Sequence, residues 1–154
     1  MKKATTWLLI ANTNSALIYD ISSHEHLPKL KDHLVKAFDF PEGKLKSSEL
    51  GNDEPGRYHT MGAPGSAYSP DTNPHQVELE RFSRLIGDYL LAENLAHHYE
   101  QLIVCAEPHF LGILDTHFPK HVKDSVKIKI NKDYIPMIHN SFNEFVERLR
   151  ENLL

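Results

Sequence analysis

The stretch QLIVCA at residues 101–106, followed by Glu107 and Pro108, decides the fold of this chain. A short and almost fully apolar run is typical of a central strand that is covered on both faces of a sheet. Pro108 suits the first position of a helix. That predicted helix ends at Pro119 and carries the apolar residues Phe110, Leu111, Leu114 and Phe118. A buried strand that leads directly into a helix indicates an α/β domain.

The N-terminal part of the chain predicts three further strands. Residues Thr5 to Ala11 and Ala16 to Ile21 are apolar, β-prone runs separated by Asn-Thr-Asn-Ser, which favours a tight turn, so they predict a hairpin. Residues Leu34 to Phe40 fit either a third strand or a short helix before Pro41-Glu42-Gly43, and we favour the strand. A polar link joins the hairpin to this segment.

A long loop and a long helix follow. Leu45 to Pro74 is rich in glycine and proline, and a span of this length without structure is either a disordered link or a functional loop. Asn73 can cap a helix that begins at Pro74 and runs to about Tyr99. Helical spacing places one apolar stripe on it, formed by Leu79, Phe82, Leu85, Ile86, Tyr89 and Leu90.

The C-terminal part predicts one more strand and a last helix. Ser125 to Ile130 alternates, with Val126, Ile128 and Ile130 on one face and Lys127 and Lys129 on the other. Such lysines commonly protect an edge strand from unwanted pairing. The final helix is predicted to be capped by Ser141 with Glu144 three residues later.

The order of these elements predicts a single α/β domain over residues 1–154. Three strands in a meander, extended by two crossover units, give a mixed five-stranded sheet with helices on its faces. This is a ribonuclease-H-like arrangement. A chain of 154 residues is the size of one such domain and too short for two.

Composition limits the classes of function. The net charge of -4 and the pI near 6.2 argue against a general basic surface for nucleic acid, although a local basic patch stays open. Cys105 is the single cysteine, so no intramolecular disulfide can form. The apolar run from Trp7 to Ala11 is short and lacks a typical cleavage site, so we expect a buried strand there and not a signal peptide. We expect a cytoplasmic protein without a membrane span.

Several motifs resemble one bacterial family. They are WLLIA at residues 7–11, SEL at 48–50, DEPGR at 53–57, LIVCAEPHFLGIL at 102–114 and NKD at 131–133. Together they resemble the "protein required for attachment to host cells" family over nearly the whole chain. The resemblance implies distant similarity to the central domain of archaeal and eukaryotic peptide-chain release factors.

Two departures from these patterns change what the resemblance implies. Release factors act through a Gly-Gly-Gln tripeptide, and this chain contains none, so peptidyl-tRNA hydrolysis by that route is not implied. Members of the attachment family often carry Asp-Gly after the first strand, whereas this chain has Asn12 and Thr13, which weakens a metal role there. The family name describes a cellular phenotype, and an indirect effect on attachment fits this chain better than an adhesin.

The predicted fold places a group of polar residues at one rim of the sheet. In open α/β sheets, ligands bind at the carboxyl ends of the strands, near the point where strand order reverses. Free N–H groups of the helix that begins at Pro108 add a place for an anion. The residues that reach this rim, with Arg57 and His59 from the loop, are Asn12, Asn14, Glu107, His109, Lys132 and Asp133. Ordinary caps and turns are the alternative reading of these residues.

Some of these residues also invite a chemical reading. Arg57 suits bidentate phosphate or carboxylate recognition, or else a salt bridge that pins the loop. Glu107 and His109 resemble an acid–base pair, with Asp133 as a third candidate, but two positions apart at a helix start they can diverge. The eleven histidines form no coherent ligand set, so we expect no metal and no cofactor. Cys105 lies in the apolar strand and fits a small buried hydrophobe.

These observations leave three hypotheses. The leading one is a non-enzymatic cytosolic module that contacts RNA or the translation machinery through the rim and the loop. The second is a hydrolase or nuclease-like enzyme that uses Glu107, His109 and Asp133 at the same rim, with or without a divalent ion. The third is a protein-binding domain, which a large exposed apolar patch would favour.

Overall fold

The computed structural model describes residues 4–41 and 74–153. Its strands and helices, in chain order, are β1 (Thr6–Ala11), β2 (Ser15–Asp20), the 3-10 helix η1 (His24–His33), β3 (Leu34–Asp39), α4 (Pro74–Leu95), β4 (Gln101–Ala106), α5 (Pro108–His117), α6 (Lys120–Ser125), β5 (Val126–Ile130), α7 (Ile135–Asn140) and α8 (Phe142–Leu153). The predicted loop, with Arg57 and His59, lies outside the described residues, except that Pro74 begins α4.

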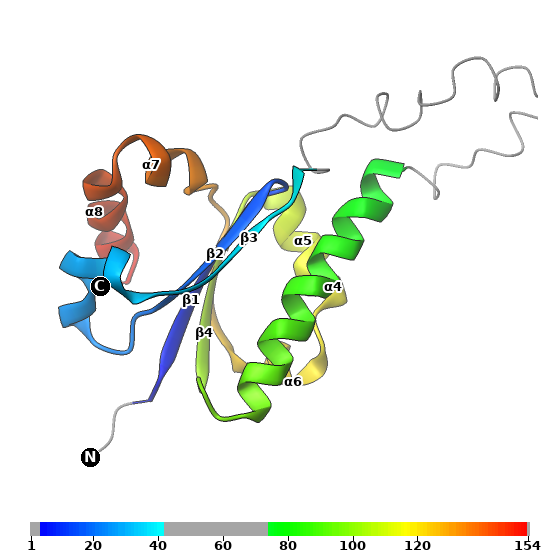
Figure 1. Ribbon diagram of the computed structural model, residues 1–154, viewed down its shortest axis with the longest axis horizontal. Helices are drawn as coiled ribbons and strands as arrows, with labels where there is room; N and C mark the ends of the chain where they lie inside the picture. Colours follow the sequence, from blue (N-terminus) through cyan, green and yellow to red (C-terminus); the bar gives the residue numbers. More distant parts are fainter. Residues whose placement is uncertain (1–3, 42–73, 154) are drawn as a thin grey trace, which may run out of the picture.

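The sheet is mixed and five-stranded, in the order β3-β2-β1-β4-β5 (Figure 1). Strands β1, β2 and β3 form the predicted antiparallel meander. Strand β4 then pairs parallel with β1, and β5 pairs parallel with β4. The predicted single α/β domain, with its meander and two crossover units, is therefore confirmed, and β4 is an interior strand as its apolar sequence indicates.

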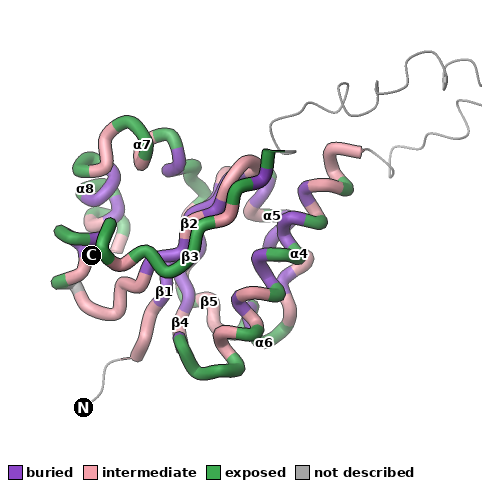
Figure 2. Tube along the Cα trace, in the orientation of Figure 1, coloured by how far each residue is buried: buried purple, intermediate pink, exposed green. Residues whose placement is uncertain are grey.

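Helices cover both faces of this sheet (Figure 1). Helices α4, α5 and α6 pack on one face, and η1, α7 and α8 pack on the other. Because side chains alternate along a strand, neighbouring residues of β1 and β4 enter opposite clusters. Leu9 and Val104 face α4, whereas Leu8 and Cys105 face α8. Both strands are buried almost throughout, which Figure 2 shows in purple.

Aromatic rings stack in the cluster beneath α4. Phe82 of α4 lies between Phe40 and Phe110, with ring centroids 4.5 and 5.6 Å apart. The ring of Trp7 stacks on Tyr99 at 4.8 Å and on Tyr89 at 6.5 Å. These contacts fix the middle of α4, at Phe82 and Tyr89, against the sheet.

The end of α4 differs from the prediction. The helix stops at Leu95, before Tyr99, because His97 adopts a left-handed φ of 62°. The amide of His98 donates to Glu93 O at 3.0 Å and that of His97 to Asn94 O at 2.9 Å, the pattern of a Schellman motif. The left-handed position of this motif is usually glycine. Because histidine occupies it here, the sequence did not indicate the end of the helix.

The structure also contains three helices that the sequence did not predict. The polar link before β3 holds η1, which begins after Ser23, whose Oγ accepts from Glu25 N at 3.2 Å. Helix α6 follows Pro119, and α7 occupies the segment before α8. All three are short or irregular, so their apolar spacing gave no helical signal.

Strand β5 is an edge strand, as predicted, but its alternation is interrupted. The pairing register shifts between Leu102 and Ile103, which face Val126 and Ile128. Val126 consequently packs on the α4 side, whereas Ile128 packs on the α8 side. The predicted common face for Val126, Ile128 and Ile130 is therefore wrong, because a bulge inserts one residue into the strand. No helix within the described residues is long and apolar enough to cross a membrane.

Candidate functional site

Asn12 is the centre of the rim at the carboxyl ends of β1, β4 and β5. Its side chain is buried, and Nδ2 donates to both carboxylate oxygens of Asp133, at 3.3 and 3.2 Å. Its Oδ1 accepts from the backbone amides of Asn14 at 2.8 Å and Ser15 at 3.0 Å. One amide side chain therefore closes the turn between β1 and β2 and joins it to the segment after β5.

Asp133 also orders the chain on its own side of this contact. Its Oδ1 accepts from the backbone amide of Ile135 at 3.0 Å, at the start of α7. Lys132, the preceding residue, is exposed. Tyr134, the next one, is buried, and burial raises the pKa of its phenol above the usual 10.0. The carboxylate of Asp133 thus fixes α7 relative to the turn between β1 and β2.

An open groove of about 530 Å³ lies beside these contacts. Its walls come from the turn between β1 and β2, the end of β3 and helix α7, and its lining residues are Asn12, Asn14, Ser15, Leu17, Phe38, Asp39, Ile135, Pro136 and His139. The side-chain Oδ1 of Asn14 is buried and has no hydrogen-bond partner within residues 4–41 and 74–153. An unsatisfied buried acceptor of this kind is costly unless a ligand or water supplies a donor.

Glu107 has a structural role at the start of α5. Its Oε1 accepts from Phe110 N at 2.6 Å and its Oε2 accepts from His109 N at 3.2 Å, so the side chain caps the helix. The expected free N–H groups for an anion are therefore partly occupied by the protein's own carboxylate, which corrects that expectation. The side chain of His109 is exposed.

Apart from the exposed Lys132, the predicted candidates separate into three groups. Asn12 and Asp133 are in contact, and Asn14 joins them through its backbone amide and lines the groove. Glu107 and His109 lie after the neighbouring strand β4, where Glu107 serves the backbone of its own helix. Arg57 and His59 lie outside the described residues.

Sequence reasoning missed Phe38, Asp39, Pro136 and His139, which line the groove. Phe38 and Asp39 lie at the end of β3. The pairing of β3 with β2 brings them to the groove, and this pairing is not visible in the sequence of β3 itself. His139 lies on α7, a helix that the sequence did not predict. A signal was present in Pro136, since proline is common in the first turn of a helix.

The structure also bears on metal and thiol chemistry. In the part of the chain that the structure describes, no group of three or more His, Cys, Asp and Glu residues could hold a metal ion. Cys105 is buried on the α8 side of the sheet, and burial raises the pKa of its thiol to about 12. Its thiol is therefore protonated at neutral pH and unsuited to act as a nucleophile.

A mixed five-stranded sheet with helices on both faces and an open groove at the strand ends defines the class of this protein as a single α/β domain. Comparison with models of known families identifies the family to which this domain belongs. The model described as "Protein required for attachment to host cells" matches residues 7–145, so the chain belongs to this host-attachment family. A search of curated proteins found no match.

Proposed function

We propose that this protein is a non-enzymatic binding module whose ligand site is the groove at the carboxyl ends of the strands. The observation that carries the proposal is the buried and unpartnered Oδ1 of Asn14 on the wall of that groove. A ligand with an N–H or O–H donor would satisfy this acceptor. A buried acceptor without a partner has lost its hydrogen bonds to water, which is unfavourable. A donor from the ligand would restore one hydrogen bond and so favour binding.

The groove has the chemistry for a nucleobase, and we propose single-stranded RNA as the ligand. Proteins bind unpaired bases by stacking them on aromatic or imidazole rings and by hydrogen bonds to their edges. His139 supplies an imidazole ring and Asn14 supplies an amide, whereas the ring of Phe38 packs on Phe82 and Tyr89 on the α4 side. Lys132 is exposed beside Asp133 and is available to a phosphate. Asp39 on the same wall repels phosphates, which favours a base over the backbone in the groove.

Two further considerations support contact with the translation machinery. The strand order β3-β2-β1-β4-β5, with its antiparallel meander and two parallel additions, supports assignment to the ribonuclease-H-like folds. The sequence motifs support distant similarity to the central domain of release factors. We therefore propose ribosomal or transfer RNA as the source of the bound strand, in the cytoplasm, with host attachment as an indirect consequence.

A hydrolase acting at the same rim is the less supported alternative. Both carboxylate oxygens of Glu107 accept hydrogen bonds from backbone amides of α5. The carboxylate of Asp133 accepts from Asn12 and Ile135. Acid–base catalysis requires a carboxyl group that can reach the substrate. Both carboxylates are held in place by these hydrogen bonds, which favours a structural role for them.

Crosslinking in cells tests the RNA proposal. RNA crosslinked to the protein is recovered and sequenced for the unchanged chain, for Asn14→Ala, for His139→Ala and for His121→Ala, whose residue is exposed on α6 away from the groove. We expect recovery of one RNA class to fall about fivefold or more in the two groove variants and to stay unchanged in His121→Ala. Arg57→Ala separately tests the predicted contribution of the loop.

The outcome that refutes RNA binding is equally definite. If no RNA crosslinks at low salt, where phosphate contacts are strongest, the proposal is wrong. Equal recovery from all variants would place any RNA contact away from the groove.

A protein partner is a second candidate, favoured by one observation at the opposite edge of the sheet from β5. Strand β3 exposes two large apolar side chains at its start, Leu34 by 45% and Val35 by 37%. An exposed edge of this kind can accept a further strand from a partner. Val35→Lys should abolish such pairing without affecting RNA recovery, and an unchanged set of captured proteins would exclude it.

A further inference from the structure

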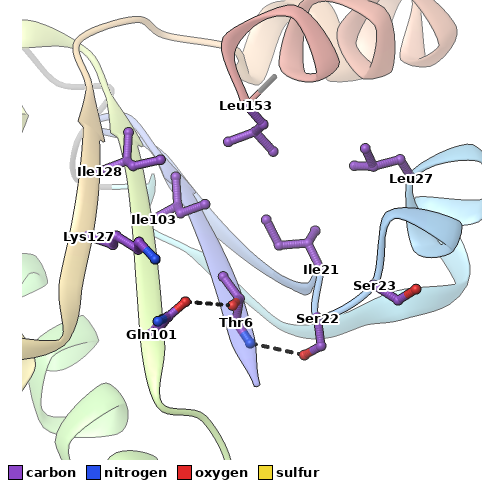
Figure 3. Close-up of a pocket in the computed structure, with 10 residues that line it drawn as sticks. All are labelled: Thr6, Ile21, Ser22, Ser23, Leu27, Gln101, Ile103, Lys127, Ile128 and Leu153. Atoms are coloured by element: carbon purple, nitrogen blue, oxygen red, sulfur yellow. Dashed lines mark hydrogen bonds between the residues drawn. The ribbon is translucent and has the colours of Figure 1, made fainter. Parts of the chain in front are cut away.

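A second pocket lies at the other end of the sheet from the rim. It measures about 350 Å³ and opens where β1 and β4 begin, between the start of η1 and the end of α8 (Figure 3). Its lining residues are Thr6, Ile21, Ser22, Ser23, Leu27, Gln101, Ile103, Lys127, Ile128 and Leu153. A volume of this size is within the range of small-molecule sites.

The apolar part of the lining forms one continuous surface. Ile103 and Ile128 come from adjacent strands, and Leu27 and Leu153 face them from η1 and α8 (Figure 3). Ile21 lies between these two sides in the same view. A hydrocarbon chain placed here would remove aliphatic surface from water on several sides at once.

The polar part of the lining contains one charged group, the ammonium of Lys127. Lys127 is the inserted residue at the β5 bulge and extends toward Gln101 (Figure 3). Lys127 forms no ion pair within the residues that the structure describes, whereas Lys129 pairs with Asp115 at 2.6 Å. Gln101 Oε1 accepts from Thr6 Oγ1 at 3.3 Å, which leaves its Nε2 directed at no described acceptor.

The hydroxyl groups on the uncharged side of the pocket already form hydrogen bonds within the protein. Ser22 Oγ accepts from Thr6 N at 3.0 Å and donates to Asp20 Oδ1 at 2.5 Å. Asp20 itself does not line the pocket and also accepts from the backbone amide of Ser22, so its charge is held by that turn. Among the residues that the structure describes, no carboxylate lines the pocket, so this lining is complementary to a negative charge.

We propose that this pocket binds a medium-chain monocarboxylate. The carboxylate lies at Lys127 and the Nε2 of Gln101, and the alkyl chain lies along Ile103, Ile128 and Leu153. A cation and an amide donor at one end of an apolar surface match the head and body of such a ligand. This site is separate from the groove at the rim and does not depend on the function proposed there.

Titration of the isotopically labelled protein tests the assignment, with octanoate, octanol and octylammonium as probes. Each probe is added below its aggregation concentration while amide chemical shifts are recorded. We expect octanoate to give saturable shifts at Thr6, Gln101 and Ile103, and octylammonium to give none, because a second cation would face Lys127. Octanol should bind more weakly at the same residues.

Two matched variants complete the test. Lys127→Met retains the aliphatic stem and removes the charge, so octanoate should bind about tenfold more weakly while octanol is unaffected. Lys129→Met, on the same strand but paired with Asp115, should leave octanoate binding unchanged. Leu153→Trp fills the apolar end and should abolish binding of both probes. Equal effects of the two lysine variants, equal binding of octylammonium, or the absence of saturable shifts would each overturn the proposal.

Discussion

The side chain of Asn12 connects two segments that are distant in the chain, since its partner Asp133 lies 121 positions away. We predict that Asn12→Ala lowers the free energy of unfolding by about 2–4 kcal/mol. The substitution removes donors to the exposed carboxylate of Asp133 and a buried acceptor for two backbone amides. Urea denaturation measures the change, with Asn143→Ala on the exposed side of α8 as the control.

Asn12→Asp separates the two halves of this contact. Aspartate keeps an acceptor for the amides of Asn14 and Ser15 but sets a second carboxylate against Asp133. We expect its loss of stability at pH 7 to be larger at low than at high ionic strength, because salt screens the repulsion between the two carboxylates. A loss that stays constant with ionic strength would show that repulsion from Asp133 is not the cause.

Glu107 gives a second prediction about a single residue. We expect Glu107→Ala to lower the free energy of unfolding by about 1 kcal/mol, because α5 loses the cap on two of its first amides. His109→Ala should have little effect, since its side chain is exposed. Thermal unfolding of both variants decides the matter. A larger effect for His109 would mean that its imidazole makes a contact of structural importance.

Alkaline pH should weaken the fold through Cys105. Its pKa is about 12 in the folded protein, against 9.0 for an unburied thiol. Above pH 9 the unfolded chain loses this proton while the folded protein retains it, so the stability present below pH 9 falls as the pH rises toward 12. Cys105→Ala should therefore lose less stability between pH 8 and pH 11 than the unchanged chain. Identical slopes in denaturation at several pH values would contradict this.

The residue types at the rim could be predicted from the sequence, whereas their roles could not. Asn12 and Asp133 were expected at the strand ends because β1 and β5 could be recognised from their apolar patterns. Which atoms they bind depends on the distance between strands far apart in sequence, and no local pattern carries that information. Glu107 is an example. From the sequence alone, a carboxylate before Pro108 can equally be a catalytic acid, a residue beside an anion site or a helix cap.

At the level of elements, predictability depended on length and regularity. The long helix α4 and the apolar strand β4 carry strong periodic patterns, and both were predicted. Helix α7 has six residues and η1 contains Pro28 and a kink at Lys29, so neither presents a full helical stripe. The residues that these elements bring to the groove, including His139, were missed for the same reason.

Two helical glycines provide a matched prediction at this level. A Cβ on Gly87 of α4 would meet Pro119 Cδ at 3.0 Å and Phe118 Cδ1 at 3.3 Å, whereas one on Gly112 of α5 would meet nothing within 4 Å. Alanine favours a helix by about 1 kcal/mol over glycine. We therefore expect Gly112→Ala to raise the free energy of unfolding by about 0.5–1 kcal/mol. Gly87→Ala should lower it, because crowding at the junction of α5 and α6 outweighs propensity.

Denaturant titration distinguishes the two glycine variants. If Gly87→Ala stabilises the protein as much as Gly112→Ala does, α4 can move away from Pro119 without cost. That outcome would show that the close approach of α4 to the loop between α5 and α6 is incidental. The expected opposite signs would show that the glycine is needed for this contact.

In the whole molecule, one sheet separates two hydrophobic clusters, and we predict that they unfold together. Phe145 belongs to the cluster on the α8 side, whereas Trp7, the only tryptophan of the chain, belongs to the cluster beneath α4. Phe145→Ala should cost about 3–5 kcal/mol. Because β1 and β4 contribute side chains to both clusters, loss of one cluster should release the strands that support the other. Tryptophan fluorescence and helical circular dichroism should therefore shift to the same lower urea midpoint. Unchanged fluorescence midpoints with a two-step loss of helix would instead show that the α4 face folds without α7 and α8.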